Sequence, residues 1–335
     1  MQTLNSVKIL YGYPYFPSNT YLDVEQSSLQ YIRRLQNEGF DVEGFCLTLN
    51  PPASCCTFPE MNIRWILRDK TLLKMYESLE KKLEGKDVLL NASGINLHPE
   101  FVSKLKVFTV FQCFDDPESS NNLSRPVARA YDLCLVGNIA EVDTYRNWGA
   151  SNVEWIPLGL FPGSYDTSLT YDMILNGERD IGLFMMIDRS IKVRKERLNK
   201  LENAFPNSHF YGKGWARGYL SYEQEINYLK RARIGPNLHL STGPINFRTY
   251  YLPANGVMQI CDNKSNLGKI YDLNKEVVGF DTVEECIELC QYYLAHDNER
   301  KQIAANGWKR AIADYDEVAV FKRTMDIIQK YMENS

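Results

Sequence analysis

Hydrophobic and polar residues follow two periods along the first half of the chain. Short apolar runs rich in β-branched and aromatic residues alternate with stretches whose apolar residues recur at helical spacing. The pattern predicts strands at 7–11, 40–47, 87–91, 107–111, 133–136 and 153–156, and helices at 24–38, at 72–83 and from Pro99. Strands that alternate with helices in this way form parallel sheets with crossover helices.

Residues 157–179 interrupt the alternation, since Pro, Gly, Ser, Tyr and Asp occur there without a clear period, as in a linker. After it the pattern predicts strands at 180–186, 209–211, 234–238, 257–260 and 277–280, and helices at 193–204, 222–231, 248–254 and 283–294. Two α/β halves of similar size predict two Rossmann-like domains that face each other across a cleft. We expect an N-terminal domain over 1–165, a C-terminal domain over 175–315 and a final helix over 316–335.

The final helix carries one apolar stripe, whose members recur every three or four residues: Val318, Phe321, Met325, Ile328 and Met332. Such a stripe must pack on another surface. On spacing alone, packing on the domain that precedes the helix is slightly favoured.

Composition narrows the function classes. The 335 residues include 38 Lys and Arg against 42 Asp and Glu, so the formal net charge is −4. A protein that grips phosphate backbones usually has a basic excess, so nucleic acid is an unlikely partner. The eight cysteines form no C-x-x-C pair and several lie in apolar runs, which is typical of free thiols in a reducing cytoplasm. We find no basic leader with a long apolar core and no apolar run of about 18 residues, and therefore expect a cytoplasmic protein without a transmembrane segment.

Several familiar catalytic signatures are absent from the sequence. It contains no G-x-x-x-x-G-K-[ST] phosphate loop, no G-x-S-x-G elbow and no H-E-x-x-H zinc motif. The glycines between Gly212 and Gly218 do not have the G-x-G-x-x-G spacing, and they follow the wrong strand for a dinucleotide site. A common NAD dehydrogenase, serine hydrolase or zinc protease is therefore disfavoured.

A succession of short motifs over 232–315 is more informative. It places Asn237 near a strand end, then NFRTYYLPANG at 246–256, a strand ending in Asp262, VVGF at 277–280, and IAANGW at 303–308. In this order the chain resembles the C-terminal module of GT-B glycosyltransferases, especially the CgeB-type spore-maturation branch. Weaker similarity covers the N-terminal half, in VFQCFDDP at 110–117, YD at 131–132 and WIPLG at 155–159.

The resemblance implies a GT-B architecture, with a nucleoside-diphosphate sugar bound mainly by the C-terminal domain and the acceptor by the N-terminal one. It places donor contacts at Asn237, Arg248, Tyr250, Tyr251, Asn255 and Gly256. In such enzymes the final helix commonly crosses back to the N-terminal domain, and we expect its apolar stripe to contact the first 165 residues.

A diphosphate donor needs free N–H groups at a helix N-terminus and a cation to neutralise the leaving group. The predicted helix after Gly243-Pro244, with Asn246 as its N-cap, supplies the first, and Arg248 and Arg194 supply the second. The alternative for Arg248 is a solvated arginine. For Arg194 that alternative weighs about equally, because basic residues crowd 192–200.

One residue departs from the family pattern. Tyr251 stands where the family usually has a glutamate that binds the ribose hydroxyls, and a phenol offers one oxygen in place of a carboxylate. Lys213, Gly214 and Trp215 form a second donor-side candidate, with backbone access, a charge and a stacking face; a tight turn with a partly buried Trp is the alternative.

Candidate catalytic residues lie in the N-terminal half. Asp115 or Asp116 follows a strand at the predicted cleft edge and could accept the proton of the acceptor hydroxyl, although a turn-capping role is as plausible for one of them. His98 is the rival base, unless it only precedes a helix that starts at Pro99. The loop 12–19 provides Tyr13, Tyr15 and Asn19 as acceptor contacts, with core packing as the alternative for the aromatics.

The sequence thus predicts a metal-independent glycosyltransferase without a cofactor other than its nucleotide-sugar co-substrate. The acceptor is a hydroxyl of a small molecule, a glycan or a surface polymer. A nucleotide-sugar epimerase and a non-catalytic nucleotide- or sugar-binding module remain alternatives, and glycosylation of a modified nucleic-acid base is a remote one.

Overall fold

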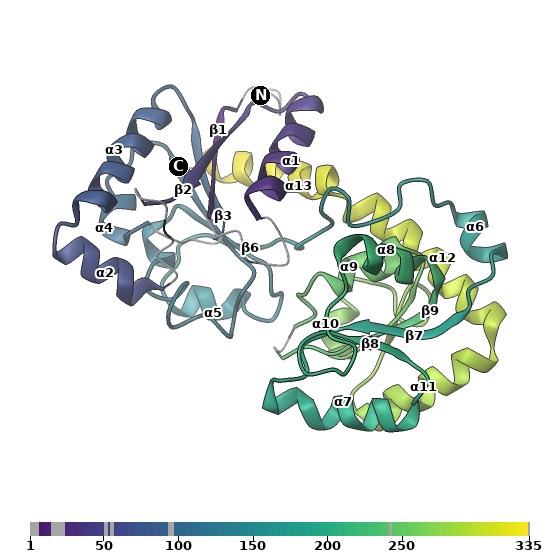
Figure 1. The fold of residues 1–335 in the computed structure, drawn as a ribbon. Coiled ribbons are helices and arrows are strands. Elements are labelled where there is room, and N and C mark those ends of the chain that lie inside the picture. Colours follow the sequence, from purple (N-terminus) through teal and green to yellow (C-terminus); the bar gives the residue numbers. More distant parts are fainter. Residues whose placement is uncertain are drawn as a thin grey trace. The chain divides into compact units, whose positions relative to one another are not determined.

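All strands in the described part of the chain belong to two parallel sheets, one in each of two compact units (Figure 1). The structure is a computed structural model, and it describes residues 7–14, 24–49, 53, 57–92, 97–240 and 243–333. Unit 1 comprises Met1–Pro157 and Glu317–Ser335, and unit 2 comprises Leu158–Asp316. The predicted α/β class with two parallel sheets is confirmed.

Unit 1 contains a six-stranded sheet in the order β2-β1-β3-β4-β5-β6. The strands are β1 (Ile9–Pro14), β2 (Val42–Leu47), β3 (Val88–Ala92), β4 (Phe108–Cys113), β5 (Leu133–Val136) and β6 (Val153–Trp155). Its helices are α1 (Val24–Asn37), α2 (Phe58–Ile66), α3 (Lys70–Leu83), α4 (Pro99–Val102), η2 (Ala128–Ala130), α5 (Val142–Asn147) and α13 (Glu317–Met332).

The sheet of unit 1 is buried on both faces, which explains its nearly continuous apolar strands. Because side chains alternate along a strand, Leu89 of β3 packs in the core that includes α3, whereas Val88 and Leu90 pack in the core that includes α13. Each face therefore needs its own layer of helices.

The last helix, α13, belongs to the core of unit 1 and lies beside α1 (Figure 1). The ring of Phe321 packs edge-on against Phe40 at 5.0 Å and Tyr31 at 6.3 Å. Four stripe residues are buried there, namely Val318, Phe321, Met325 and Ile328. At the other end of the helix, Lys330 and Tyr331 each donate a 2.8 Å hydrogen bond to Glu154.

Unit 2 contains a five-stranded sheet in the order β11-β10-β9-β7-β8. The strands are β7 (Ile181–Met186), β8 (His209–Tyr211), β9 (Ala232–Asn237), β10 (Met258–Cys261) and β11 (Val278–Gly279). The helices are α6 (Tyr171–Asn176), α7 (Lys192–Ala204), α8 (Tyr222–Arg231), α9 (Arg248–Ala254), α10 (Lys264–Leu267), α11 (Val283–Ala295) and α12 (Asp297–Asp314). Strand β9 lies at the centre, so side chains that follow β9, β7 and β10 meet at one edge of the sheet.

None of the helices in the described ranges is long and apolar enough to cross a membrane.

Candidate functional site

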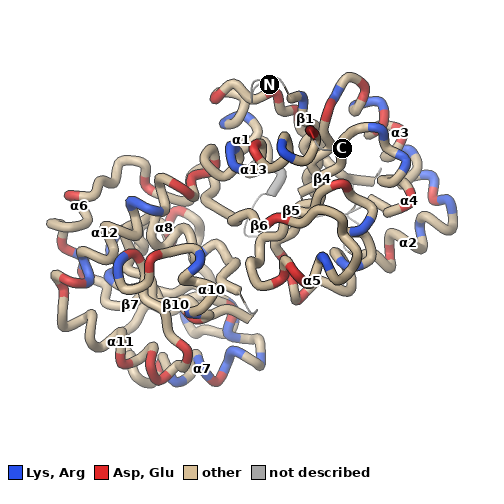
Figure 2. Tube along the Cα trace, turned by 180° about the vertical axis from the view of Figure 1, so that it is seen from behind, with Lys and Arg blue, Asp and Glu red and all other residues tan. Residues whose placement is uncertain are grey.

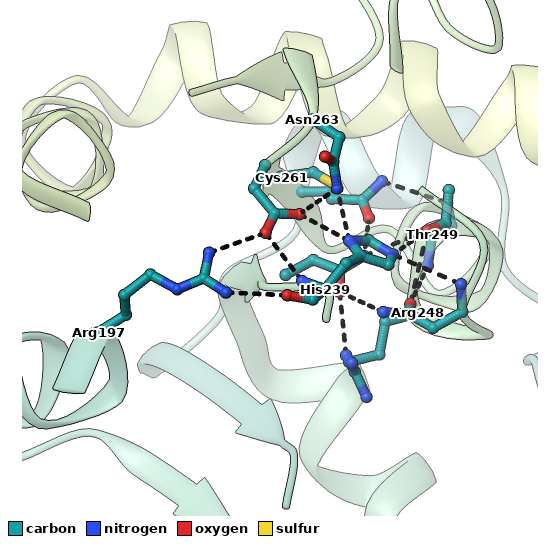
Figure 3. A network of polar contacts seen from close by, with 10 residues as sticks. Arg197, His239, Arg248, Thr249, Cys261 and Asn263 are labelled. Carbon is teal, nitrogen blue, oxygen red and sulfur yellow. Dashed lines mark hydrogen bonds and ion pairs between the residues drawn. The ribbon is translucent and has the colours of Figure 1, made fainter. Parts of the chain in front are cut away.

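Asn237, the last residue of β9, is the centre of a polar network at the carboxyl edge of the unit 2 sheet. Figure 3 shows part of this region, with His239, Arg248 and Thr249 labelled. Its side chain is completely buried, and its amide Nδ2 donates to Oε1 of Gln259 at 2.8 Å and to Oγ1 of Thr249 at 3.3 Å. Its Oδ1 accepts from Nε of Arg248 at 3.0 Å and from Nδ2 of Asn246 at 3.0 Å. Each polar atom of Asn237 thus helps to fix the segment that precedes and begins α9.

Arg248 is the first residue of α9 and is partly buried at this edge. One of its terminal nitrogens donates to the carbonyl oxygen of Met186, at the end of β7, at 3.2 Å. Burial lowers the pKa of the Arg248 guanidinium, which means that the charged form loses hydration. A bound anion would restore this lost stabilisation. The helix has the predicted bounds, but Phe247 and not Asn246 occupies the N-cap position, and Oδ1 of Asn246 accepts the N–H of Thr249 at 3.2 Å.

Arg194, on α7, lies close to Arg248 and is 6% exposed. One terminal nitrogen donates to the carbonyl oxygen of Asp188 at 2.9 Å, but within the described part of the chain its Nε has no hydrogen-bond partner. Burial, and then the positive charge of Arg248, lower the pKa of Arg194 to about 10. Two neighbouring guanidinium groups with an unsatisfied donor make an anion-binding arrangement.

Lys and Arg recur along α7 (Figure 2), and Arg197 contacts the ends of β9 and β10. Its guanidinium donates to Oδ2 of Asp262 at 3.3 Å and to the carbonyl oxygen of His239 at 2.9 Å. Arg197 is therefore partly neutralised, unlike Arg194, and connects α7 to the ends of β9 and β10.

Both ring nitrogens of His239, which follows β9, make polar contacts. Nδ1 lies 2.7 Å from Oδ1 of Asp262, and Nε2 faces the backbone N–H of Asn246 at 3.4 Å and the hydroxyl of Thr249 at 3.3 Å. Because the N–H of Asn246 can only donate, Nε2 accepts and Nδ1 carries the proton. Burial lowers the pKa of His239, which favours this neutral form. His239 therefore supports the segment before α9 through its contacts with Asn246 and Thr249.

His239, Cys261 and Asp262 form the one cluster of possible metal ligands in the described residues, with their ligand atoms within 4.8 Å of one another. The His239 and Asp262 atoms already hydrogen-bond to each other, and Asp262 also accepts a hydrogen bond from the guanidinium of Arg197. Burial raises the pKa of the Cys261 thiol well above its usual range, which disfavours a thiolate ligand. The cluster therefore fits a hydrogen-bonded support better than a metal site.

The loop Gly212–Gly218 packs against the loop after β7 because its glycines permit a close approach. Gly212 has φ of 120°, and a Cβ there would lie 2.3 Å from the carbonyl oxygen of Ile187. Trp215 is buried: its Nε1 donates to that same oxygen at 2.8 Å, and the guanidinium of Arg189 covers its ring at 4.5 Å. The Trp215 ring therefore packs in the core rather than offering a free face for stacking, whereas Lys213 and Gly214 are exposed.

Tyr251, which occupies the position where the family pattern has glutamate, contacts a glutamate from another helix. Its hydroxyl donates a 2.8 Å hydrogen bond to Oε1 of Glu225, a residue of α8 that is 7% exposed. Both groups are close enough to Arg248 to stabilise its positive charge. The sequence reasoning missed Glu225 because no local pattern connects α8 with α9.

Three other expected donor residues have packing roles. Tyr250 is fully buried against the ring of Tyr315 at 5.1 Å. Asn255 caps the C-terminus of α9 and donates to the carbonyl oxygen of Ser164 at 3.0 Å. Gly256 has φ of 67° and leaves no space for a side chain beside Ile174. These contacts join α9 to the neighbouring segments of unit 2 and account for all three residues without a ligand.

In unit 1 the two adjacent aspartates after β4 have different environments. Asp116 is 1% exposed and accepts hydrogen bonds from the hydroxyls of Tyr145 and Ser120, while its backbone oxygen accepts from Asn138 at 3.1 Å. Asp115 is exposed. The pKa of Asp115 is raised, first by partial withdrawal of its carboxyl group from water and second by the charge of Asp116. Asp116 therefore anchors the loop, and Asp115 is the carboxylate available to a ligand.

His98 has the geometry of a helix cap. Its Nδ1 accepts from the N–H of Glu100 at 3.3 Å, its Nε2 lies 3.1 Å from Oδ1 of Asn62, and its ring stacks on Trp65 at 4.7 Å. Since both ring nitrogens are engaged and the residue is 3% exposed, this arrangement argues against His98 as the base.

The expected acceptor residues are only partly described. Tyr13 is buried in the core that contains α1 and α13, so it packs inside unit 1. Tyr15 and Asn19 lie outside the described residues.

Comparison with solved structures identifies the fold as GT-B. Sucrose-phosphate synthase from Thermosynechococcus elongatus aligns with a TM-score of 0.64 and 12% identity over 98% of this chain and 100% of its own. HepE from Anabaena, solved with UDP and glucose, aligns with a TM-score of 0.62 and 12% identity over 97% and 100%. An α-glucosyltransferase solved with UDP and DNA containing an HMU base aligns with a TM-score of 0.61 and 11% identity over 96% and 100%.

A family model described as glycosyl transferase-like matches residues 192–326. The matched segment begins with α7 and includes Arg194, Asn237 and Arg248, so it covers the basic sheet edge described above. No curated protein sequence gives a significant match to the chain.

Proposed function

We propose that this protein is a glycosyltransferase that moves a sugar from a nucleoside diphosphate to a hydroxyl acceptor. One observation carries the proposal: the segment that matches the glycosyl transferase-like family brings Arg194 and Arg248 together at the carboxyl edge of a Rossmann-like sheet. This edge is where open α/β sheets bind their ligands.

In this proposal the diphosphate binds at the paired guanidinium groups. Arg194 has an unsatisfied Nε, and the charge of Arg248, after burial, lowers the pKa of Arg194, so a bound anion would stabilise its charged form. A leaving diphosphate gains negative charge as its bond to the sugar breaks, so the same cations stabilise the transition state more than the bound donor. Positive side chains can serve this role without a metal ion, and we propose a metal-independent reaction.

We assign the acceptor to unit 1 and the role of general base to Asp115. Its carboxylate takes the proton of the acceptor hydroxyl, the acceptor oxygen bonds to the anomeric carbon, and the bond from that carbon to the diphosphate oxygen breaks. The products are the glycosylated acceptor and the nucleoside diphosphate. The exposure of Asp115 and its raised pKa support the assignment over the buried Asp116.

The finer classification rests on the order of motifs. We propose a relationship to the CgeB-type branch, donor binding by unit 2, a cytoplasmic location and an acceptor that is a small molecule, a glycan or a surface polymer. Acceptor binding by Tyr15 and Asn19 belongs to the same proposal.

Thermal unfolding of the full chain with a panel of nucleoside diphosphates and nucleotide sugars tests the donor site. A ligand at ~100 times its Kd adds about 2.7 kcal/mol of stability. Release of free sugar from the stabilising donor then separates an enzyme from a non-catalytic binder. Conversion of the donor to its epimer without an acceptor would instead support an epimerase, and the absence of any nucleotide-dependent shift would contradict the proposal.

A further inference from the structure

Helix α2 carries two apolar stripes, although a surface helix normally has one. Phe58, Met61 and Trp65 pack in or against the core that contains α3. Ile63, Ile66 and Leu67 follow at three- and four-residue spacing on the other side, and they are 57%, 66% and 73% exposed. The second stripe therefore has no partner in the described part of unit 1.

Basic side chains surround this second stripe. Arg68 and Lys104 lie 5.8 Å and 5.9 Å from the centre of the Trp65 ring, and Lys70 begins α3 directly beyond the stripe. Among the residues that the structure describes, no carboxylate pairs with Arg68, Lys70 or Lys104. Lys and Arg segments along α2 and α3 are visible in Figure 2.

The carboxylates near the stripe are already engaged. Glu60 accepts the N–H of Thr57 in the capping box of α2 at 3.2 Å. Asp69 caps α3 and pairs with Arg64 at 2.8 Å. Glu100 accepts from Nε1 of Trp65 at 3.2 Å. In the described part of the chain only Asp69 of these three is paired with a cation. The four cations Arg64, Arg68, Lys70 and Lys104 outnumber the three carboxylates by one, and the net charge around the stripe is therefore positive.

We propose that this surface, defined by Ile63, Ile66, Leu67, Arg68, Lys70 and Lys104, docks on an anionic lipid bilayer. The aliphatic side chains enter the boundary between headgroups and acyl chains, and the cations contact lipid phosphates. An anionic bilayer fits better than a second copy of this chain, because two copies would bring the same unpaired cations together.

The surface lies in unit 1 and does not involve Arg194 or Arg248, so the proposal does not depend on the proposed transferase activity. If both hold, the acceptor is presented at a membrane surface.

Co-sedimentation of the full chain with vesicles tests the proposal. Vesicles of phosphatidylcholine are compared with vesicles that also contain about one third phosphatidylglycerol. We expect binding to the anionic vesicles that weakens with salt, and at least tenfold weaker binding for the double variant Ile66→Asp/Leu67→Asp. Each of Arg68→Gln, Lys70→Gln and Lys104→Gln should weaken binding by about fivefold.

Met173→Asp is the matched control, because Met173 is also an exposed apolar residue, at 54%, but belongs to α6 of unit 2. It should bind vesicles like the unaltered chain, and unchanged thermal unfolding should verify that each variant is folded. Absence of vesicle binding, or equal binding by the Ile66→Asp/Leu67→Asp variant, would overturn the proposal. Dimerisation that this variant abolishes, seen by sedimentation velocity without vesicle binding, would assign the surface to a second copy instead.

Discussion

Nε of Arg248 donates a 3.0 Å hydrogen bond to Oδ1 of Asn237, so a buried amide at the end of β9 sets the direction of the first side chain of α9. The same amide holds Gln259 and Thr249 through its nitrogen. An arginine that is fixed before the ligand arrives loses less conformational entropy when it binds. Asn237 is therefore a positioning residue for the charge of Arg248.

Replacement of Asn237 tests this relationship. Asn237→Leu keeps the approximate volume but leaves the polar groups of Gln259 and Arg248 without this partner, so we expect a loss of ~2–4 kcal/mol in unfolding free energy and weaker nucleotide affinity. Chemical denaturation and nucleotide titration measure the two effects. Asn176→Leu, at an exposed position on α6, is the control and should change neither quantity.

Arg248 itself should contribute to affinity more than to stability. Arg248→Ala is expected to weaken nucleoside-diphosphate binding by about 30-fold, which corresponds to ~2 kcal/mol, while the protein stays folded. Arg231→Ala removes an exposed arginine of the same unit and should leave affinity unchanged. Titration calorimetry distinguishes the outcomes, and equal affinity of the Arg248→Ala and unaltered proteins would show that Arg248 only supports the local structure.

Arg194 should show the opposite balance between stability and binding. Burial and the nearby Arg248 lower its pKa to about 10, so the charged form is disfavoured in the ligand-free protein. Arg194→Met removes that cost and should raise the unfolding free energy by ~1 kcal/mol, but it should abolish stabilisation by nucleotide. Melting curves with and without nucleotide measure both effects. A destabilised variant that retains the nucleotide shift would show that Arg194 is structural.

Substitution of the two aspartates after β4 should have different effects, on turnover for Asp115 and on stability for Asp116. Asp115→Asn is expected to lower kcat by ~10²–10⁴-fold with little change in donor affinity, because the amide cannot accept a proton. Asp116→Asn should mainly lower stability, since the hydroxyls of Tyr145 and Ser120 bond to that carboxylate. Steady-state kinetics and thermal unfolding, applied to both variants, decide the assignment; normal turnover by the Asp115→Asn enzyme would exclude Asp115 as the base.

The activity should also depend on pH in a predictable direction. The pKa of Asp115 is raised above 3.8 by partial burial and by Asp116. A base works only when it is deprotonated, so kcat should be fully present above the raised pKa and fall as the pH decreases through it. The acid limb of the kcat profile should therefore lie above pH 3.8. A profile that stays flat down to that pH would argue for another base.

Most strands could be predicted from the sequence because strands buried on both faces are apolar at nearly every position. Several helices could not be predicted, among them α6, which lies in the expected linker 157–179, and α2 and α12 illustrate two physical reasons. In α2 the exposed Ile63, Ile66 and Leu67 obscure the face that packs. In α12 the buried residues include Arg300, Lys301 and Gly307, and a Cβ at Gly307 would lie 2.3 Å from the carbonyl oxygen of Glu276. Periodic hydrophobicity reveals neither case.

For the site, motif order pointed to Arg248 but could not give its surroundings. Arg194 and Arg197 lie in one basic run, and only the packing of α7 reveals that the first is buried with an unpaired Nε. Asp115 and Asp116 are identical in type and adjacent, so the loop alone decides which one faces water. Glu225 was not found because its contact with Tyr251 joins two helices separated in sequence.

The assignment of Glu317–Met332 to unit 1 has a consequence for the order of folding during synthesis. Unit 2 is one continuous stretch and can complete its core as soon as Asp316 has left the ribosome. Most of unit 1 is synthesised first, but α13 follows only after all of unit 2 has been made. Until then Phe40 and Tyr31 lack their packing partner Phe321. The half that begins synthesis is therefore the half that finishes folding last, and during that interval it exposes an apolar face on which a chaperone can act.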